Sequence, residues 1–317
     1  MQTDVNILLF GWVIAATLQM ATPLILAALG GMFSERSGVV NIGLEGMMLI
    51  GAFGAVAATF FTDNPWIGVL AAIGAGGLLA VAHALVCVKF KGNHIVSGTG
   101  IILFGLGFTT LMLDVIWDRK GYSEQVTRLP DIRIDAFAGN PFLNTAFGSH
   151  SPITYMAFIM VIVSWYVLYK TPFGLRLRAA GEDPSTLDTS GASVEWTRAI
   201  GVIISGCLAG LGGAFLSIGF GSAFGKNMTN GRGFIALAAL IFGNWTPFGV
   251  LIAGLFFGFL GGLQYAIPIV PGLEWLQAYA NFVQMIPYVL VVVALAGIRK
   301  SVPPKGIAIP YEKEKKE

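Results

Sequence analysis

The side chains best suited to chemistry stand at the start of a long apolar segment. The stretch 35–48 reads ERSGVVNIGLEGMM, and apolar residues continue after it to about Phe61. Asn41 and Glu45 thus lie inside an expected membrane span, where a carboxylate costs roughly 2.5–3.5 kcal/mol and faces a protein interior or a wet cavity. Because they are four residues apart, we expect both on one helical face, lining or bracing a polar pathway. A hydrogen-bonded brace buried between helices is the alternative.

A second informative stretch is polar and runs from residue 170 to residue 198, between two apolar segments. Asp183 is a suitable N-cap, Pro184 suits the first helical position, and Gly191 marks a stop. The pattern predicts one short amphipathic helix at 183–190 that lies on the membrane surface. An ordinary capped helix within a linker is the alternative.

The third polar stretch, residues 116–150, carries acidic and basic side chains in close succession. They are Asp118, Arg119, Lys120, Glu124, Arg128, Asp131, Arg133 and Asp135. Mixed charge suits a reversible, salt-sensitive docking surface for a soluble protein, and a solvated loop without a partner is the alternative. The candidate contacts are Asp118, Arg119, Lys120 and Arg128.

No pattern of an enzyme or of a metal site accompanies these stretches. The chain has no Gly-x-x-x-x-Gly-Lys-Ser/Thr loop for ATP phosphates, no Gly-x-Ser-x-Gly elbow and no His-Glu-x-x-His pair. Its three histidines are scattered, and Cys87 and Cys207 fall in apolar segments as small buried hydrophobes. We therefore predict no catalytic residue, no metal and no cofactor in this chain.

Composition places these polar stretches in a membrane protein. Charged residues make up 11% of the 317 residues, against about 25% in a typical soluble domain, and apolar residues make up 55%. Several apolar runs reach the roughly 20 residues that a helix needs to cross a bilayer. We expect an all-α bundle of about 9 (8–10) transmembrane helices near 5–29, 38–61, 66–88, 94–115, 152–169, 198–222, 233–245, 248–267 and 281–298.

Lysine and arginine residues orient this bundle, because cytoplasmic loops carry their excess. Basic residues mark the loops near 89–91 and 170–198 as cytoplasmic, and they are absent from the N-terminal residues. Alternating spans then give an outside N-terminus, an external 116–150 loop, a single transmembrane domain at 1–300 and a cytoplasmic tail at 301–317. The first run lacks a basic flank and is too long for a secretory signal peptide.

Three further patterns bear on how the spans are built. The segment 233–245 is short for a crossing and suits a half-helix, and Pro23 predicts a kink in the first span. Glycines spaced by four, at 254, 258 and 262 and at 206 and 210, predict dense packing within the bundle. The segments 64–70 and 244–251 each begin a glycine-rich span on opposite sides, as an inverted repeat requires, with coincidence of two turns as the alternative.

The polar stretches carry a resemblance to a known family. ERSG followed by NIGLEGM at 35–47, and LRLRAAGEDP at 175–184, resemble bacterial ABC importer permeases of the branched-chain amino acid, ribose and simple-sugar group. NGRGFIALAALIFGNW at 230–245 resembles the late glycine-rich block of that family. The resemblance covers roughly residues 10–300, and within the family the chain is most similar to the nucleoside-type subgroup.

The resemblance implies a permease subunit in the bilayer of the bacterial plasma membrane that works by alternating access. Its expected partners are an ATP-binding-cassette ATPase, which uses the ATP, and an extracytoplasmic substrate-binding lipoprotein. A second permease, identical or different, completes the pathway, and no nucleic acid is expected. The expected cargo is a nucleoside, with a simple sugar or a branched-chain amino acid as alternatives. An ion-coupled secondary transporter is a further alternative, for which only Glu45, His83 and Asp114 are available as intramembrane ionisable groups.

The resemblance also implies a role for the helix at 183–190, which would dock into the ATPase. Arg178, Glu182 and Asp183 would fix its approach through charge-assisted contacts, and Gly181 and Pro184 complete the motif. The chain departs from the family here, because its helix is more polar than the usual alanine-rich or aromatic sequence. The polar residues are Thr186, Asp188, Thr189 and Ser190, and they leave open which ATPase surface the helix fits.

Overall fold

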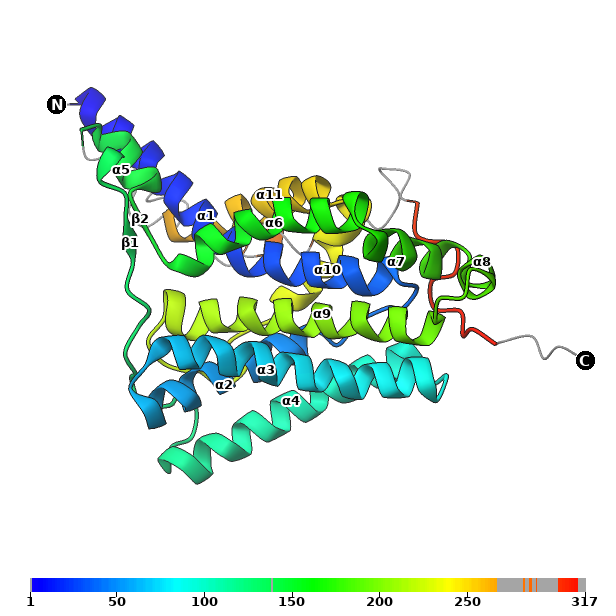
Figure 1. Cartoon of the computed structure of the whole chain (residues 1–317). Coiled ribbons are helices and arrows are strands. Elements are labelled where there is room, and N and C mark those ends of the chain that lie inside the picture. The colour runs from blue at the N-terminus through cyan, green and yellow to red at the C-terminus, as the bar shows by residue number, and fades with distance from the viewer. Residues whose placement is uncertain are drawn as a thin grey trace, which may run out of the picture.

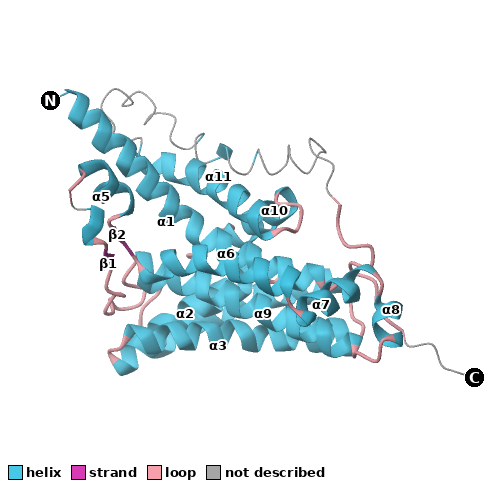
Figure 2. Ribbon diagram, turned by 45° about the horizontal axis from the view of Figure 1, so that its top comes forward, coloured by secondary structure: helices cyan, strands magenta, loops and turns pink. Residues whose placement is uncertain are grey.

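The computed structural model describes residues 2–137, 139–266, 282, 285–286, 289 and 302–312. Its regular structure is helical apart from two strands, β1 (Ile132–Arg133) and β2 (Ser149–His150), which pair antiparallel (Figure 1, Figure 2). The α-helices are α1 (Gln2–Arg36), α2 (Leu44–Thr62), α3 (Pro65–Ala84), α4 (His94–Trp117), α5 (Pro141–Phe147), α6 (Pro152–Lys170), α7 (Pro172–Glu182), α8 (Pro184–Thr189), α9 (Val194–Ala214), α10 (Arg232–Phe242) and α11 (Pro247–Ala266). Three other turns are the π-helical η1 (Leu85–Lys89) and η3 (Phe215–Phe220) and the 3-10 turn η2 (Asp135–Phe137).

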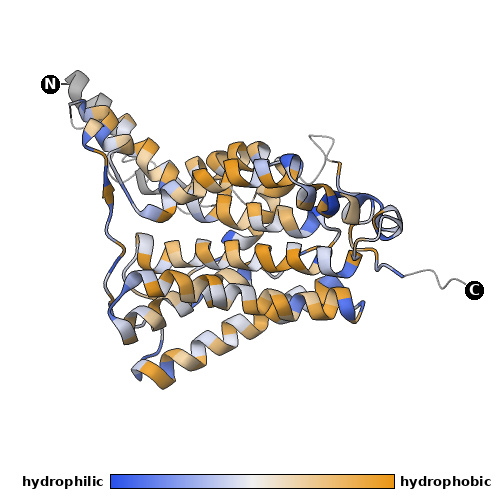
Figure 3. Ribbon diagram, viewed as in Figure 1, coloured by the Kyte–Doolittle hydropathy of each residue, from blue (hydrophilic) through white to orange (hydrophobic). Residues whose placement is uncertain are grey.

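Six of the described helices are long and apolar enough to cross a membrane. They cover Phe10–Arg36, Leu44–Thr62, Pro65–Lys89, His94–Trp117, Pro152–Lys170 and Val194–Phe220. Two shorter apolar helices, Arg232–Phe242 and Pro247–Leu263, accompany them in the described part of the chain. Figure 3 shows apolar residues along the helices and polar residues at the two ends of the bundle. The predicted all-α membrane bundle is confirmed.

The predicted spans correspond to these helices with changed bounds. α1 is longer than the expected 5–29 and continues through Pro23, and α2 begins at Leu44 rather than at residue 38. The half-helix expected at 233–245 is α10, whose 11 residues extend about 16 Å, roughly half of a hydrocarbon core. The span expected at 281–298 lies outside the described residues, apart from 282, 285–286 and 289.

Close helix packing depends on glycine at the predicted positions. On α11, Gly254, Gly258 and Gly262 lie directly against the backbone or side chains of α1. On α9, Gly206 and Gly210 lie against the backbone of α3. A methyl group at most of these positions would overlap the neighbouring helix, so the prediction of dense packing within the bundle is confirmed.

The bundle has two ends, and the site descriptions below refer to them. The α5 end contains α5, the β1–β2 pair and the N-terminus, whereas the α8 end contains α7, α8 and residues 302–312 (Figure 1). α3 begins with Pro65 at the α5 end, and α11 begins with Pro247 at the α8 end. The two similar segments at 64–70 and 244–251 therefore start helices at opposite ends, and the inverted repeat itself stays a prediction.

Candidate functional site

Glu45 caps the half-helix α10 from a distant part of the chain. It lies in the first turn of α2 and is 5% exposed. Gly231 N–H donates to its Oε1 at 2.8 Å, and Gly233 N–H donates to its Oε2 at 2.6 Å. The first amides of a helix have no intrahelical acceptor and carry partial positive charge. Both carboxylate oxygens are therefore used to satisfy the buried start of α10.

Glycine at position 233 makes this approach possible. A Cβ there would lie 2.6 Å from the backbone N and Cα of Glu45. Gly231, at φ +81°, adopts the left-handed conformation that glycine favours. The glycines of the late block thus serve the contact between α2 and α10.

Asn41 does not share a helical face with Glu45, so that part of the sequence interpretation was wrong. It lies in the non-helical segment before α2, because this helix begins only at Leu44. Its Nδ2 donates to Ser205 Oγ of α9 at 2.9 Å, and the side chain is fully buried. Asn41 therefore links the break between α1 and α2 to α9, and whether it contacts substrate stays a prediction.

Two histidines hold the residue before Asn41. The N–H of Val40 donates to Nδ1 of His94 at 3.2 Å, and its carbonyl lies 3.0 Å from Nε2 of His83. His83 Nδ1 lies 2.8 Å from Ser97 Oγ, so α3 and α4 together fix this backbone. No signal in the sequence predicted these contacts, since the α1–α2 break, α3 and α4 meet only in the folded bundle.

The end of α1 fixes the turn between α10 and α11. Trp245 Nε1 donates to Glu35 Oε2 at 2.6 Å, and Arg36 Nε donates to the Trp245 carbonyl at 2.9 Å. Asn244 and Trp245 both have left-handed backbones, at φ +50° and +52°, a strained arrangement for two consecutive non-glycine residues. The contacts with α1 hold this turn, so α10 is tied at its start to α2 and at its end to α1.

At the α8 end, the predicted cap geometry is confirmed. Asp183 Oδ1 accepts from the N–H groups of Ser185 and Thr186 at 3.1 and 3.3 Å, Pro184 is the first helical residue, and Gly191 (φ +83°) follows the helix. Hydrogen bonds from Ser185 and Thr186 lower the pKa of Asp183 to about 2. α8 is therefore a short helix capped by its own neighbouring carboxylate.

The other predicted coupling residues make contacts within the chain. The Arg178 guanidinium lies 5.0 Å from the centre of the Tyr169 ring, and Glu182 lies 3.8 Å from Arg36. Gly181 is buried against the Arg36 carbonyl, where a Cβ would overlap the backbone. These residues fix α7 against α1 and α6, and any contact with an ATPase stays a prediction.

Residues 302–312 form a strap across the α8 end, which sequence reasoning did not find. Val302 N–H donates to Asn244 Oδ1 at 2.9 Å, Gly306 N–H to the Gly181 carbonyl at 2.7 Å, and Ala308 N–H to the Gly38 carbonyl at 3.0 Å. The buried Arg198 of α9 donates to the Ile309 carbonyl at 2.9 Å and to the Ala180 carbonyl at 3.1 Å. The strap thus connects α7, the α1–α2 break and the α10–α11 turn.

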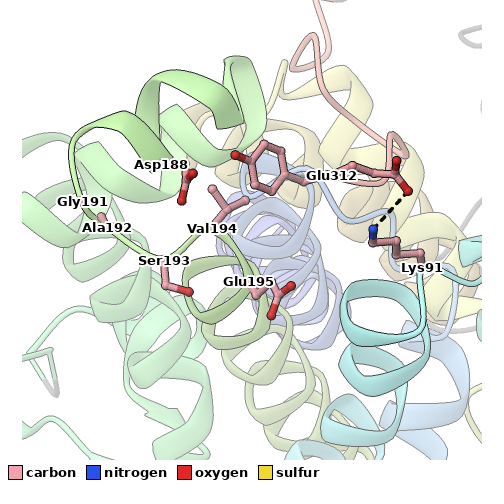
Figure 4. A pocket seen from close by; sticks show the side chains of 9 residues that line it. Lys91, Asp188, Gly191, Ala192, Ser193, Val194, Glu195 and Glu312 are labelled. Carbon is pink, nitrogen blue, oxygen red and sulfur yellow. Dashed lines mark hydrogen bonds and ion pairs between the residues drawn. The ribbon is translucent and has the colours of Figure 1, made fainter. Parts of the chain in front are cut away.

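A cavity of about 640 Å³ lies between α8, the start of α9 and this strap (Figure 4). Its polar lining includes Asp188, Glu195 and the exposed ion pair of Lys91 with Glu312, whose charged atoms are 3.1 Å apart. The cavity opens beside α8, so it belongs to the same surface as the predicted coupling helix.

The predicted docking loop at the α5 end is partly paired internally. Arg119 lies 3.1 Å from Glu124, and Arg128 lies 3.6 Å from Asp131 and donates to the Gly219 carbonyl at 3.3 Å. Asp118 ends α4 at φ +50°, and Lys120 is exposed. The geometry neither requires nor forbids a soluble partner, so docking stays a prediction.

The described residues contain no group of three or more His, Cys, Asp or Glu side chains that could hold a metal ion.

Residues 13–295 match the family model described as branched-chain amino acid transport system / permease component. The chain therefore belongs to this family of ABC transporter permeases. Such a subunit is a transport component rather than an enzyme, and a partner ATPase hydrolyses the ATP. The family also implies an ATPase and a substrate-binding protein as partners.

Three curated relatives define the likeness more narrowly. The guanosine ABC transporter permease protein NupQ of Bacillus subtilis is 40% identical over 96% of this chain and 97% of its own length. The nucleoside ABC transporter permease protein NupC of Lactococcus lactis is 36% identical over the same shares. The guanosine ABC transporter permease protein NupP of Bacillus subtilis is 27% identical over 78% of this chain and 72% of its own length. None of the solved structures matches the chain significantly.

Proposed function

We propose that this chain is the permease subunit of an ATP-driven nucleoside importer. The observation that carries the proposal is the likeness to guanosine and nucleoside permeases over 96% of the chain. A protein of this kind needs a surface for an ATPase and a polar route through the bundle. The exposed helix α8 and the buried contact between Glu45 and α10 suit those two needs.

In this proposal the α8 end is cytoplasmic and the α5 end is extracytoplasmic, with nine crossings. The orientation rests on the basic residues near 89–91 and 170–198, which gather at the α8 end. The ATPase then contacts the exposed hydroxyl face of α8, which includes Ser185, Thr186 and Thr189. Arg178, Gly181, Glu182, Asp183 and Pro184 position that face, since each makes its contacts within the chain.

Movement at α8 can reach the pathway through a short series of contacts. α7 and the strap contact the α1–α2 break, and the strap also contacts Asn244. Asn244 and Trp245 form the turn that follows α10. The start of α10 is bound to Glu45, which we assign the role of a brace at the pathway. Alternating access then consists of α10 and α2 shifting together relative to the second permease.

The α5 end receives the substrate-binding lipoprotein in this scheme. Its mixed charges, with Asp118, Arg119, Lys120 and Arg128 as contacts, suit fast and salt-sensitive binding. The second permease is a different chain. NupQ and NupP are both guanosine permeases of one bacterium, and their names support this choice. Purifying an affinity-tagged copy and probing for an untagged copy tests it, because a homodimer would carry both.

The deciding experiment is uptake of radiolabelled guanosine in the source cell with and without this gene. Unlabelled nucleosides, ribose and leucine serve as competitors, and an uncoupler tests for dependence on an ion gradient. We expect uptake to require the gene, to be blocked only by nucleosides and to survive the uncoupler while ATP is present. Unchanged guanosine uptake with lost ribose or leucine uptake would assign a different cargo. Loss of uptake with the uncoupler alone would favour an ion-coupled transporter.

A further inference from the structure

The chain between η3 and α10 descends into the bundle without forming a helix. Just before it, in η3, Ile218 lies against Gly68 beside Thr59, near the α5 end of α2. Phe224 then packs edge-to-face on Phe53, with ring centres 5.4 Å apart. Phe53 is in the middle of α2, about 12 Å along the helix from Glu45 at 1.5 Å per residue. The segment ends at Gly231, which is bound to Glu45. Residues 225–231 therefore run from the loop at the α5 end, where Lys226 N–H donates to the Gly121 carbonyl, to the first turn of α2.

Polar side chains of this segment are exposed. Lys226, Asn227 and Asn230 are exposed, whereas Phe224 and Thr229 beside them are fully buried. Two tight turns hold the backbone, as Met228 N–H donates to the Gly225 carbonyl and Asn230 N–H to the Asn227 carbonyl, both at 3.0 Å, and Lys226 N–H ties the segment to the Gly121 carbonyl at 2.7 Å. The segment is thus built to present these side chains away from the bundle core.

An aromatic ring lies beside the same segment. Tyr122 is 72% exposed, forms a β-bridge with Gly225, and its ring lies where a Cβ on that glycine would be 2.9 Å away. Ser123 and Phe224 exchange two hydrogen bonds of 2.9 Å, which anchor the loop that carries Tyr122 beside this segment. The ring and the amides therefore form one exposed surface.

Lipid cannot cover this surface. Irregular backbone and charged or amide side chains at membrane depth are tolerated only inside protein or along a water-filled cavity. The lipid-compatible faces of this chain look different, since the exposed residues of α3 and α4 include Leu70, Leu78, Leu103 and Leu111. The surface at 225–230 must therefore face water or a partner.

We propose that Tyr122 and residues 225–230 line the translocation pathway and contact the cargo, with Asn227 and Tyr122 as the specificity-determining residues. The inference rests on the proposed function and names the part of the chain that carries it out. An aromatic face stacks on a nucleobase, and an asparagine amide both donates to and accepts from base edges or ribose hydroxyls. The ligand class that this pair fits is an uncharged nucleoside, whose base can stack on the ring while its polar edges and ribose hydroxyls bond to the amides.

Thiol labelling in intact cells tests whether the surface faces water. Asn227→Cys is placed in a functional chain that also carries Cys87→Ala and Cys207→Ala, expressed with its partner subunits. Leu78→Cys is the matched control, because Leu78 is 71% exposed in the middle of α3 on an apolar face. We expect a membrane-impermeant methanethiosulfonate to modify Asn227→Cys, to lower guanosine uptake at least tenfold and to act more slowly when guanosine is present. Leu78→Cys should remain unmodified.

Two outcomes would overturn the proposal. One is an Asn227→Cys protein that reaches the membrane with its partner subunits and that the reagent does not modify, which would place the segment against a partner chain. The other is modification that leaves uptake unchanged. If the cells import a cargo other than guanosine, the proposed function fails, but labelling that blocks that other uptake would still place the pathway here.

A second pair of variants keeps the test independent of cysteine substitution. Tyr122→Leu removes the ring, and Tyr122→Phe retains it. We expect the KM for guanosine to rise roughly 5- to 100-fold in the first variant, as for loss of one stacked base, and to stay near wild type in the second. Equal behaviour of the two variants would exclude stacking on Tyr122.

Discussion

Two short helices of this permease, α8 and α10, both begin under a carboxylate, but the origins of the carboxylates differ. Asp183 immediately precedes α8 and is exposed, whereas Glu45 reaches α10 from α2, 186 residues before Gly231, and is buried. The capping hydrogen bonds of α8 come from the residue next to it, so they persist when α8 moves relative to other helices. α10 keeps its cap only while α2 and α10 stay together. The contrast separates a helix suited to contact a partner from one suited to move as part of the pathway.

The largest expected effect comes from removing the remote cap. Glu45→Ala leaves the buried N–H of Gly233 and the partly buried N–H of Gly231 without an acceptor, at a cost of about 1–3 kcal/mol for a fully buried donor. We expect guanosine uptake to fall at least about tenfold and the melting temperature of the purified transporter to drop. Glu45→Gln keeps one acceptor but sets an NH₂ group against the other donor, so it should lie between Ala and wild type. Wild-type uptake in Glu45→Ala would remove Glu45 from both the pathway and the brace.

Alanine substitutions at two glycines, one at the start of α10 and one after α8, compare the two helices by steric crowding. Gly233→Ala places a Cβ 2.6 Å from the backbone of Glu45, and overpacking of this kind costs about 1–3 kcal/mol. Gly191 follows α8, and a Cβ there would meet no atom within 4 Å. Gly191→Ala should therefore cost only the strain of a left-handed backbone at a non-glycine residue, about 1–2 kcal/mol, confined to an exposed turn. We expect Gly233→Ala to impair both uptake and thermal stability, and Gly191→Ala to leave the stability of the bundle unchanged. Equal loss of bundle stability in both variants would contradict the distinction.

The sequence predicted the cap of α8 but not the cap of α10, because the first is local in the chain and the second is not. The cap of α8 depends on residues that are adjacent in the chain, so Asp183, Pro184 and Gly191 were sufficient to predict it. Apolar run lengths likewise predicted the long helices. The partners of Glu45 are 186 and 188 residues away, and only tertiary packing brings them together. Asn41 was wrongly predicted to lie on the helix, because the apolar sequence continues through the non-helical residues before Leu44 and gives no sign of them.

The strap at 302–312 also depends on contacts between residues far apart in the sequence, so the sequence did not predict it. A change at Arg198 tests whether the strap transmits movement. Arg198→Met removes the donor for the Ala180 and Ile309 carbonyls while keeping an unbranched side chain that fills the first part of the same space. We expect a loss of about 1–3 kcal/mol and a several-fold lower coupling of ATP hydrolysis to uptake in the reconstituted transporter. Lys91→Met is the control, because its ion pair with Glu312 is exposed and such pairs contribute about 0–1 kcal/mol. Coupling that is unchanged in Arg198→Met would show that the strap has no part in transmission.

Removing the local cap should have a smaller effect. Asp183→Ala loses the acceptor for the Ser185 and Thr186 amides, and the loss of a capping side chain weakens the first turn of a helix. We expect ATP hydrolysis stimulated by the loaded binding protein to fall a few-fold, with no change in the melting temperature of the bundle. Asp183→Asn retains a capping oxygen and should restore most of the activity. A lower bundle melting temperature in Asp183→Ala would mean that α8 is not independent of the core.

The smallest effect expected is that of pH on this same cap. The hydrogen bonds that lower the pKa of Asp183 to about 2 make the ionised form the one that α8 requires. A carboxylate with a lowered pKa contributes its stability above its ordinary pKa and loses it as the pH falls toward the lowered value. Between pH 5.5 and 8 the cap therefore stays ionised. The ratio of stimulated ATP hydrolysis in wild type to that in Asp183→Asn, which has no charge to titrate, should be constant across this range. A ratio that falls below pH 6 would show that the carboxylate takes up a proton when α8 contacts its partner, so that the contact itself, rather than the isolated helix, sets the protonation of Asp183.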